Sequence, residues 1–199
     1  MSARRHAPAT ARNREPIAEV LAAELPASGL VLEIASGSGE HVIHFARHLP
    51  DLTFQPTDPT VESLRSVAAW VSSSNVPNIL PPLRLSTTDQ PWPVTAADAI
   101  LCINMIHISP WAATEGLMRG AAGLLRPGAP LYLYGPYKQE GRHTAPSNEA
   151  FDRQLKNQNP AWGVRDLEAV RDLAKSAGFL APRLTEMPAN NLSLVFYRN

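Results

Sequence analysis

The sequence is poor in cysteine, in long apolar runs and in net charge. Its 199 residues include one cysteine, Cys102, which excludes an intramolecular disulfide and fits a reducing compartment. No stretch approaches the roughly 20 apolar residues of a membrane span, and the first residues lack the apolar core of a signal peptide. We therefore expect a cytoplasmic protein without a membrane partner, with Cys102 as a small buried residue rather than a nucleophile.

The balance of charge also excludes a class of partner. Lys+Arg and Asp+Glu both number 18, so no overall field would draw in a polyanion, and the four tryptophans are too scattered to form a stacking platform. We expect no nucleic-acid partner. The charge is uneven, because several arginines precede the first acid, Glu15. Residues 1–14 are thus predicted to be an N-terminal arm, either mobile and solvated or able to bind phosphate.

Strand-like and helix-like segments alternate along the chain, which we expect to form one domain over residues 1–199. Periodicity predicts helices over 15–25, 40–48, 60–71, 111–125 and 164–178. It predicts strands over 30–35, 52–58, 81–89, 96–108, 129–137, 179–187 and 191–198. This order is typical of a doubly wound, Rossmann-like α/β fold with helices on both faces of a mostly parallel sheet. The short PANN connector favours a hairpin, so the last strand should be antiparallel.

A glycine-rich loop, ASGSG, lies between the first predicted strand and the helix that follows. No Gly-Lys-Ser/Thr follows it, which excludes a phosphate-cradling loop. A dinucleotide fingerprint needs a third small residue where this chain has Val42, and Glu40 would repel a pyrophosphate at the helix N-terminus. Both features disfavour a nicotinamide-dependent oxidoreductase.

Three acids around this loop indicate a different ligand. Asp58 ends the second strand, where a carboxylate can accept both ribose hydroxyls. Asp89 follows the third strand, where it can accept the amino group of adenine, and Glu33 precedes the loop, where it can attract a cation. A ligand with ribose, adenine and positive charge but no phosphate is S-adenosylmethionine, which we expect to be the cofactor.

The order of elements resembles that of class I S-adenosylmethionine-dependent methyltransferases. More narrowly, FARHLP, NMIHISPW, LYLYGPYK, GRHTAPSNEAFD, WGVRDLEAV and MPANNLSLVF resemble a methyltransferase-like family of unassigned substrate, domain of unknown function 938. The resemblance runs from about Arg12 to Phe196. It implies the fold and the cofactor but names no substrate.

The resemblance also implies which residues hold the cofactor. Those expected beside its methionine part are Glu33, Ala35, Gly37 and Gly39. Asp58 would hold the ribose, Asp89 would lie near adenine, and Asn104 and Met105 would flank the sulfonium. Many class I enzymes carry glycine where this chain has Ala35. Because alanine disfavours positive φ, we expect a slightly different loop path.

Acceptor-side residues should follow the strands at the same edge of the sheet. His107 is the candidate general base; the alternative is a histidine hydrogen-bonded to backbone near Pro110. Tyr134 and Tyr137 flank Gly135-Pro136, and either could position an acceptor. We expect Tyr134 to belong to the core and leave Tyr137 open between core and site.

Two further segments could close the site. The polar segment 138–162 is predicted to be irregular, and it is either a substrate-side cover or a plain solvated loop. It carries Arg142, Asn148 and His143, the last a candidate catalytic residue. Arg12 and Asn13 either fold over the cofactor carboxylate or belong to a frayed end.

We therefore predict methyl transfer by in-line displacement to a small or medium-sized acceptor, with a protein side chain also possible. The alternative is a non-catalytic module that binds S-adenosylmethionine or S-adenosylhomocysteine within a complex. His41, His44 and His48 are spaced like metal ligands on one helix, but no matching carboxylate is evident, so we expect no metal.

Overall fold

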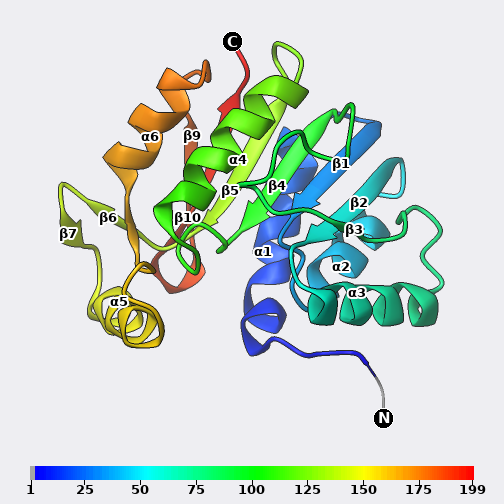
Figure 1. The fold of residues 1–199 in the computed structure, drawn as a ribbon, viewed down its shortest axis with the longest axis horizontal. Helices are drawn as coiled ribbons and strands as arrows, with labels where there is room; N and C mark the ends of the chain where they lie inside the picture. The colour runs from blue at the N-terminus through cyan, green and yellow to red at the C-terminus, as the bar shows by residue number, and fades with distance from the viewer. Residues whose placement is uncertain (1–2) are drawn as a thin grey trace.

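The computed structural model describes residues 3–199, and its centre is a seven-stranded sheet (Figure 1). The strands lie in the order β3-β2-β1-β4-β5-β10-β9, and β10 is antiparallel to both of its neighbours. The strands are β1 (Gly29–Ile34), β2 (Leu52–Asp58), β3 (Leu83–Arg84), β4 (Ala99–Ile103), β5 (Pro130–Gly135), β9 (Arg183–Met187) and β10 (Asn191–Tyr197). The predicted Rossmann-like fold class, with an antiparallel last strand, is confirmed.

Helices cover both faces of this sheet (Figure 1). They are α1 (Pro8–Glu24), α2 (Glu40–His48), α3 (Val61–Ser74), α4 (Trp111–Leu124) and α6 (Leu167–Ser176), while α5 (Pro146–Gln158) lies beyond the edge of the sheet (Figure 1). Leu117 of α4 and Val170 of α6 pack on one face, while Ile17 of α1 and Phe45 of α2 pack on the other. Successive residues of β4 alternate between these two cores, which explains why the central strand is apolar throughout.

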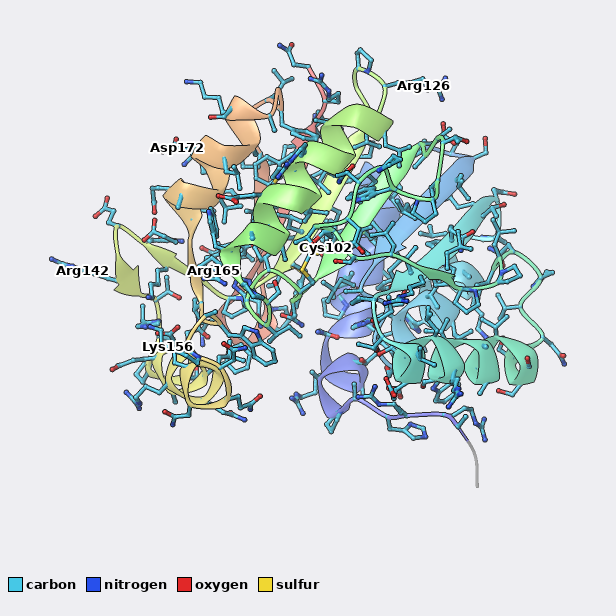
Figure 2. All side chains as sticks on the ribbon, viewed as in Figure 1. Cys102, Arg126, Arg142, Lys156, Arg165 and Asp172 are labelled. Atoms are coloured by element: carbon cyan, nitrogen blue, oxygen red, sulfur yellow. The ribbon has the colours of Figure 1, made fainter. Side chains whose placement is uncertain are left out.

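Local signals in the sequence are met by the structure. Thr60 caps α3, accepting a hydrogen bond from the backbone amide of Ser63 at 3.3 Å. Cys102 lies in the middle of the sheet (Figure 2), and burial raises its pKa to about 12. The expectation that Cys102 is a buried small residue is therefore confirmed.

The first helix begins well before its predicted start. α1 begins at Pro8 and contains Pro16 in its interior, where the missing amide leaves the Arg12 carbonyl without its helical partner. The first turns of α1 bury only polar residues, Thr10 and Asn13, so they carry no apolar periodicity. Residues 8–14, half of the predicted N-terminal arm, are therefore helical.

The residues before α1 dock along α2 and α3 (Figure 1). The Arg5 amide donates to Ser66 Oγ at 2.8 Å, and the Trp70 indole donates to the Arg5 carbonyl at 3.0 Å. The Ala7 amide donates to Glu40 Oε2 at 2.7 Å. These contacts hold residues 5–7 beside the first turn of α2, where the glycine-rich loop ends.

The segment 138–162 is also more regular than predicted. It contains β6 (Tyr137–Gln139), β7 (Arg142–His143) and then α5. β6 pairs with β7 and with β8 (Arg165–Asp166) in a small second sheet. The side chains that α5 buries, Asn148, Asp152 and Leu155, are mostly polar. Hydrophobic periodicity therefore could not reveal this helix.

Across residues 3–199, no helix is both long enough and apolar enough to cross a bilayer.

Candidate functional site

The glycine-rich loop leaves β1 at the carboxyl edge of the sheet and turns into α2. Ala35, Gly37 and Gly39 all have positive φ, at 57°, 58° and 92°. Ala35 thus adopts the left-handed conformation that glycine favours, so the alanine does not exclude this path. A Cβ at Gly39 would lie 2.9 Å from the Cα of Val67, so this glycine also lets α3 pack against the loop.

Asp58 braces this loop from the end of β2. Its Oδ2 accepts the Gly37 amide at 3.1 Å, while its Oδ1 accepts the amide and the hydroxyl of Thr60 at 2.9 and 2.8 Å. An ionised carboxylate offers about four acceptor positions. Asp58 therefore retains room for a ligand hydroxyl, although it is mostly buried.

Glu33 lies beneath the loop with one oxygen unpaired. It is 2% exposed, and its Oε2 has no hydrogen-bond partner. Burial raises the pKa of Glu33 to about 7, a hydrogen bond with Ser36 opposes that shift, and the nearby charge of Asp58 adds to it. A buried acceptor with no partner, next to a second carboxylate, fits a cationic or hydrogen-bond-donating ligand.

Asp89 lies at the same edge but takes no part in this arrangement of carboxylates. It is exposed in a turn after β3, where its Oδ1 accepts a long hydrogen bond of 3.4 Å from the Thr88 hydroxyl. Its place near adenine stays a prediction.

Asn104 ends β4 in a strained conformation. Its φ is 61°, and its amide donates to the Tyr134 carbonyl at 2.8 Å, which fixes the strand end. Ile34 pairs with Cys102, so Ala35 and Asn104 leave neighbouring strands at the same edge. Met105, next along the chain, is 8% exposed and packs into the core on the α4 side. A strained residue at a strand end is typical of a ligand site.

A cavity of about 720 Å³ opens beside Asn104. Its walls come from the first turns of α1, the ends of β4 and β5, one side of α5 and the turn before β10. They mix apolar and polar side chains: Arg12, Asn13, Asn104, Ile108, Tyr134, Pro136, Asn148, Phe151, Gln154, Leu155, Gln158 and Pro188, among others. A volume of this size with mixed lining fits a small molecule.

Asn13 connects the cavity to the glycine-rich loop. Its Oδ1 accepts from His41 Nε2 at 2.9 Å, and His41 belongs to the first turn of α2. Burial raises the pKa of Tyr134, and a hydrogen bond with Asn13 opposes this rise. Arg12, one residue earlier, is exposed at the rim. Both residues predicted to close over the ligand therefore lie in the cavity wall, and neither belongs to a frayed end.

Both tyrosines are buried in the core. Tyr134 is 3% exposed and packs in the core as expected, and it also borders the cavity. Tyr137, left open between core and site, is 1% exposed inside the core beneath α4 and α6. The Tyr137 hydroxyl has no partner, and burial raises its pKa well above the usual value. The alternation of β5 continues to Tyr137, which shares one core with Leu131 and Leu133, while Tyr134 lies on the opposite face. Tyr137 does not touch the cavity.

His107 is fully buried behind the cavity wall, with an exposed fraction of 0%. Its Nδ1 accepts the Arg165 amide at 3.2 Å, and its ring packs edge-on against Tyr137 at 5.0 Å. Burial lowers the pKa of His107 to about 3, and the charge of Arg165 contributes. The imidazole is thus neutral and hydrogen-bonded to backbone, which corresponds to the alternative given for it, although the partner is Arg165 rather than a residue near Pro110.

His143 also lies outside the cavity lining. Its Nε2 lies 3.3 Å from Asp152 Oδ2, which also accepts from Lys156 at 2.7 Å. Asp152 Oδ1 accepts the Val164 amide at 2.8 Å. This buried carboxylate holds α5 against β7 and β8, so His143 helps to position the cover. Figure 2 shows Arg142, from the same strand, extending away from the sheet.

Arg165 is the residue that the sequence gave no reason to single out. Its Nε donates to the Ile106 carbonyl at 2.8 Å and its Nη2 to the Ser109 carbonyl at 2.5 Å. Its guanidinium also lies 5.7 Å from the centre of the Trp111 ring. Figure 2 places it between β8 and the start of α4. No local pattern marks this arginine, because WGVRDL mixes charged and apolar residues.

Asn148 belongs to the cavity through α5. It is 4% exposed, and its amide donates to Thr144 Oγ1 at 3.1 Å and to the Asn190 carbonyl at 2.9 Å. These bonds join α5 to the turn before β10. The segment 138–162 therefore packs over the cavity as ordered structure.

Solved structures of methyltransferases share this architecture. An O-methyltransferase family protein from Burkholderia thailandensis matches with a TM-score of 0.80 and 18% identity, over 96% of this chain and 57% of that one. An O-methyltransferase family 2 protein from Planctomyces limnophilus, in complex with apigenin, matches with a TM-score of 0.80 and 18% identity, over 94% of this chain and 56% of that one. Human N-acetylserotonin methyltransferase, in complex with S-adenosylmethionine, matches with a TM-score of 0.73 and 15% identity, over 94% of this chain and 55% of that one.

The chain spans little more than half the length of these three proteins, between 55% and 57%. At such low identity the likeness establishes the fold. The family described as "Protein of unknown function (DUF938)" matches residues 4–198, nearly the whole chain. The chain therefore belongs to the DUF938 family and has a methyltransferase-like fold.

Proposed function

We propose that the protein binds S-adenosylmethionine and transfers its methyl group to a small acceptor held in the cavity. The observation that carries this proposal is the meeting of two features at one sheet edge. A glycine-rich loop braced by Asp58 leaves β1, and the strained Asn104 leaves the neighbouring β4 into the cavity. Structural neighbours with S-adenosylmethionine or S-adenosylhomocysteine bound support the choice of cofactor.

The donor set near the loop fits this cofactor. The free acceptor position of Asp58 would take a ribose hydroxyl. The unpaired Oε2 of Glu33 would accept a hydrogen bond from the methionine part or lie beside its positive charge. Ala35, Gly37 and Gly39 would allow close approach of the ligand, and Asp89 would approach adenine. When bound, S-adenosylmethionine would supply a methyl group that is already activated.

The residues of the chain would then act mainly by positioning. Asn104 and Tyr134 would orient the acceptor, Met105 would support the strand end from beneath, and Arg12 would pair with the cofactor carboxylate. Phe151 and Leu155 of α5 would exclude water from the cavity. Holding two reactants in line in a dry site accounts for much of the rate of such a transfer.

The cavity lining also limits the acceptor. Among the described residues that line it, Arg12 and Tyr134 are the only ones with titratable side chains, and burial raises the pKa of Tyr134. Neither is suited to remove a proton near neutral pH. We therefore infer an acceptor whose reacting atom already has a free lone pair, such as an uncharged amine or an ionised phenol. His107, Tyr137 and His143 are assigned positioning roles behind the cavity.

Calorimetric titration with S-adenosylmethionine, and separately with S-adenosylhomocysteine, tests the proposal. Asp58→Asn should bind either ligand roughly tenfold or more weakly, because charge-assisted hydrogen bonds are worth about 1.5–3 kcal/mol each. Asp51→Asn is the matched control, since Asp51 is exposed just before the opposite end of β2. Equal affinity in Asp58→Asn and the parent would refute the ribose assignment. No binding of either ligand to the parent would refute the cofactor.

A non-catalytic binding module is the rival, because a cavity without a base at neutral pH would also suit a protein that binds without turnover. Transfer of a radiolabelled methyl group to any member of an amine and phenol library would exclude this rival. Tight binding without transfer to any member would favour it.

A further inference from the structure

Three side chains from two helices converge on one point of the surface, away from the cavity lining. Glu15 comes from α1, and His44 and His48 come from α2, where they are one turn apart. One ligand atom from each lies within 4.8 Å of the others. The sequence shows the two histidines but not the carboxylate, because Glu15 joins them only when α1 packs on α2.

The shorter distance in this cluster is that of a long hydrogen bond, and the longer one lies outside hydrogen-bond range. Glu15 Oε2 lies 3.3 Å from His44 Nε2 and 3.7 Å from His48 Nε2. Ligand atoms bound at about 2.0–2.1 Å to a tetrahedral ion lie roughly 3.3–3.4 Å apart. The 3.3 Å separation therefore matches an edge of a coordination tetrahedron, the 3.7 Å separation is a few tenths of an ångström longer, and one carboxylate oxygen faces both imidazoles.

The histidines are also oriented as ligands would be. His48 Nδ1 donates to the His44 carbonyl at 2.8 Å, which leaves the lone pair of its Nε2 directed at the cluster. A hydrogen bond from the second ring nitrogen to a carbonyl is the usual support of a metal-binding imidazole. His44 is 8% exposed, and its Nε2 is buried without a hydrogen-bond partner.

We propose that Glu15, His44 and His48 bind a divalent transition-metal ion of the Zn²⁺ type. Two imidazoles and one carboxylate suit such an ion, and the exposed side of the cluster leaves a fourth position for water. Arg14 is the nearby cation, with its Nε 4.0 Å from Glu15 Oε1. Arg14 lies beside the other carboxylate oxygen, so its charge lowers the affinity of the site for a cation without filling the site.

The ion would clamp α1 to α2 rather than take part in chemistry. None of the three ligands lines the cavity. One turn earlier, however, α1 contributes Arg12 and Asn13 to the cavity wall, and α2 begins where the glycine-rich loop ends. Binding the ion would hold both parts of the site in place and raise the stability of the folded chain.

The test uses the full chain, stripped with a chelator and titrated with Zn²⁺ against a chromophoric competitor. We expect one tight equivalent, weakened by more than about tenfold in Glu15→Gln and in His48→Gln. Both side chains are exposed, so both variants should fold, which circular dichroism checks. Glu19→Gln, one turn along α1, and His6→Gln are matched controls that should bind like the parent.

Two further measurements assess geometry and role. Co²⁺ should give the strong visible absorption of a four-coordinate site in the parent and not in the two ligand variants. A hundredfold excess of Zn²⁺ over its Kd should raise the melting temperature of the parent by about 5–10 °C. Parent affinity no tighter than that of a Glu15→Gln, His48→Gln double variant would overturn the proposal, as would equal losses in the controls.

Discussion

Ionising Glu33 should destabilise the protein as the pH rises from about 4.5 to 7. Burial raises the pKa of Glu33 from 4.5 to about 7 in the folded chain. Between these values the folded state holds a proton that the unfolded state has released, so stability falls with rising pH. The difference amounts to roughly 3 kcal/mol, at about 1.4 kcal/mol for each pH unit. Below pH 4.5 the contribution is fully present, and above pH 7 it is lost.

Urea unfolding of the parent and Glu33→Gln across pH 4–8 measures this effect. Glutamine keeps the shape of the neutral acid, so the two proteins should be similarly stable at pH 4.5. At pH 8 the free energy of unfolding of the variant should exceed that of the parent by about 3 kcal/mol, which corresponds to roughly 6–12 °C in melting temperature. Other buried groups, including His41 and His107, titrate in both proteins and cancel in the difference.

Glu62→Gln is the control, because Glu62 is an exposed carboxylate on α3. A constant difference between parent and Glu33→Gln over the whole pH range would refute the reasoning. It would mean that Glu33 is charged in the folded chain and that an unseen donor pairs with its Oε2.

Further predictions concern the loop, the strand end and the cover. Gly39→Ala should lower the free energy of unfolding in urea by at least about 2 kcal/mol, because φ is 92° and the new Cβ would meet α3. Gly123→Ala is the control: its Cβ would enter open space, so this variant should be as stable as the parent or more stable. Asn104→Ala should be about 1 kcal/mol less stable than Asn104→Gly, since only glycine adopts φ 61° freely, and both should lose methyl transfer; equal stabilities would contradict the strain at this position. Arg165→Lys should unfold at lower urea concentration and expose Trp111 fluorescence to quenching, because one ammonium cannot reach the carbonyls that the guanidinium spans; unchanged quenching would show that Arg165 does not hold this loop.

The pattern of apolar residues determined most of the fold. Periodicity located α2 and β2 at their observed bounds, and the short PANN connector indicated the antiparallel β10. The carboxylates at Glu33 and Asp58 were found from their positions at strand ends. Such features are local, because each depends on residues adjacent in the chain or on the direction of a strand.

Tertiary structure decided which polar residues are buried and which reach the cavity. The start of α1 and the whole of α5 bury polar side chains such as Asn13 and Asp152, so no apolar period marks them. His107 is enclosed because Arg165 arrives from far along the chain. Such contacts depend on how distant elements pack.

The cavity and the Glu15 cluster both depend on packing between elements that are distant in the sequence. Tyr134 borders the cavity because α5 and the turn before β10 complete its wall, whereas Tyr137 lies on the opposite face, in the core beneath α4 and α6. Glu15 meets His44 and His48 only where α1 lies on α2. The sequence by itself determined the sheet, the loop and their carboxylates, because these follow from local pattern. Packing decided whether each polar side chain lies in the core or at the site, because that placement depends on partners that the local sequence does not contain.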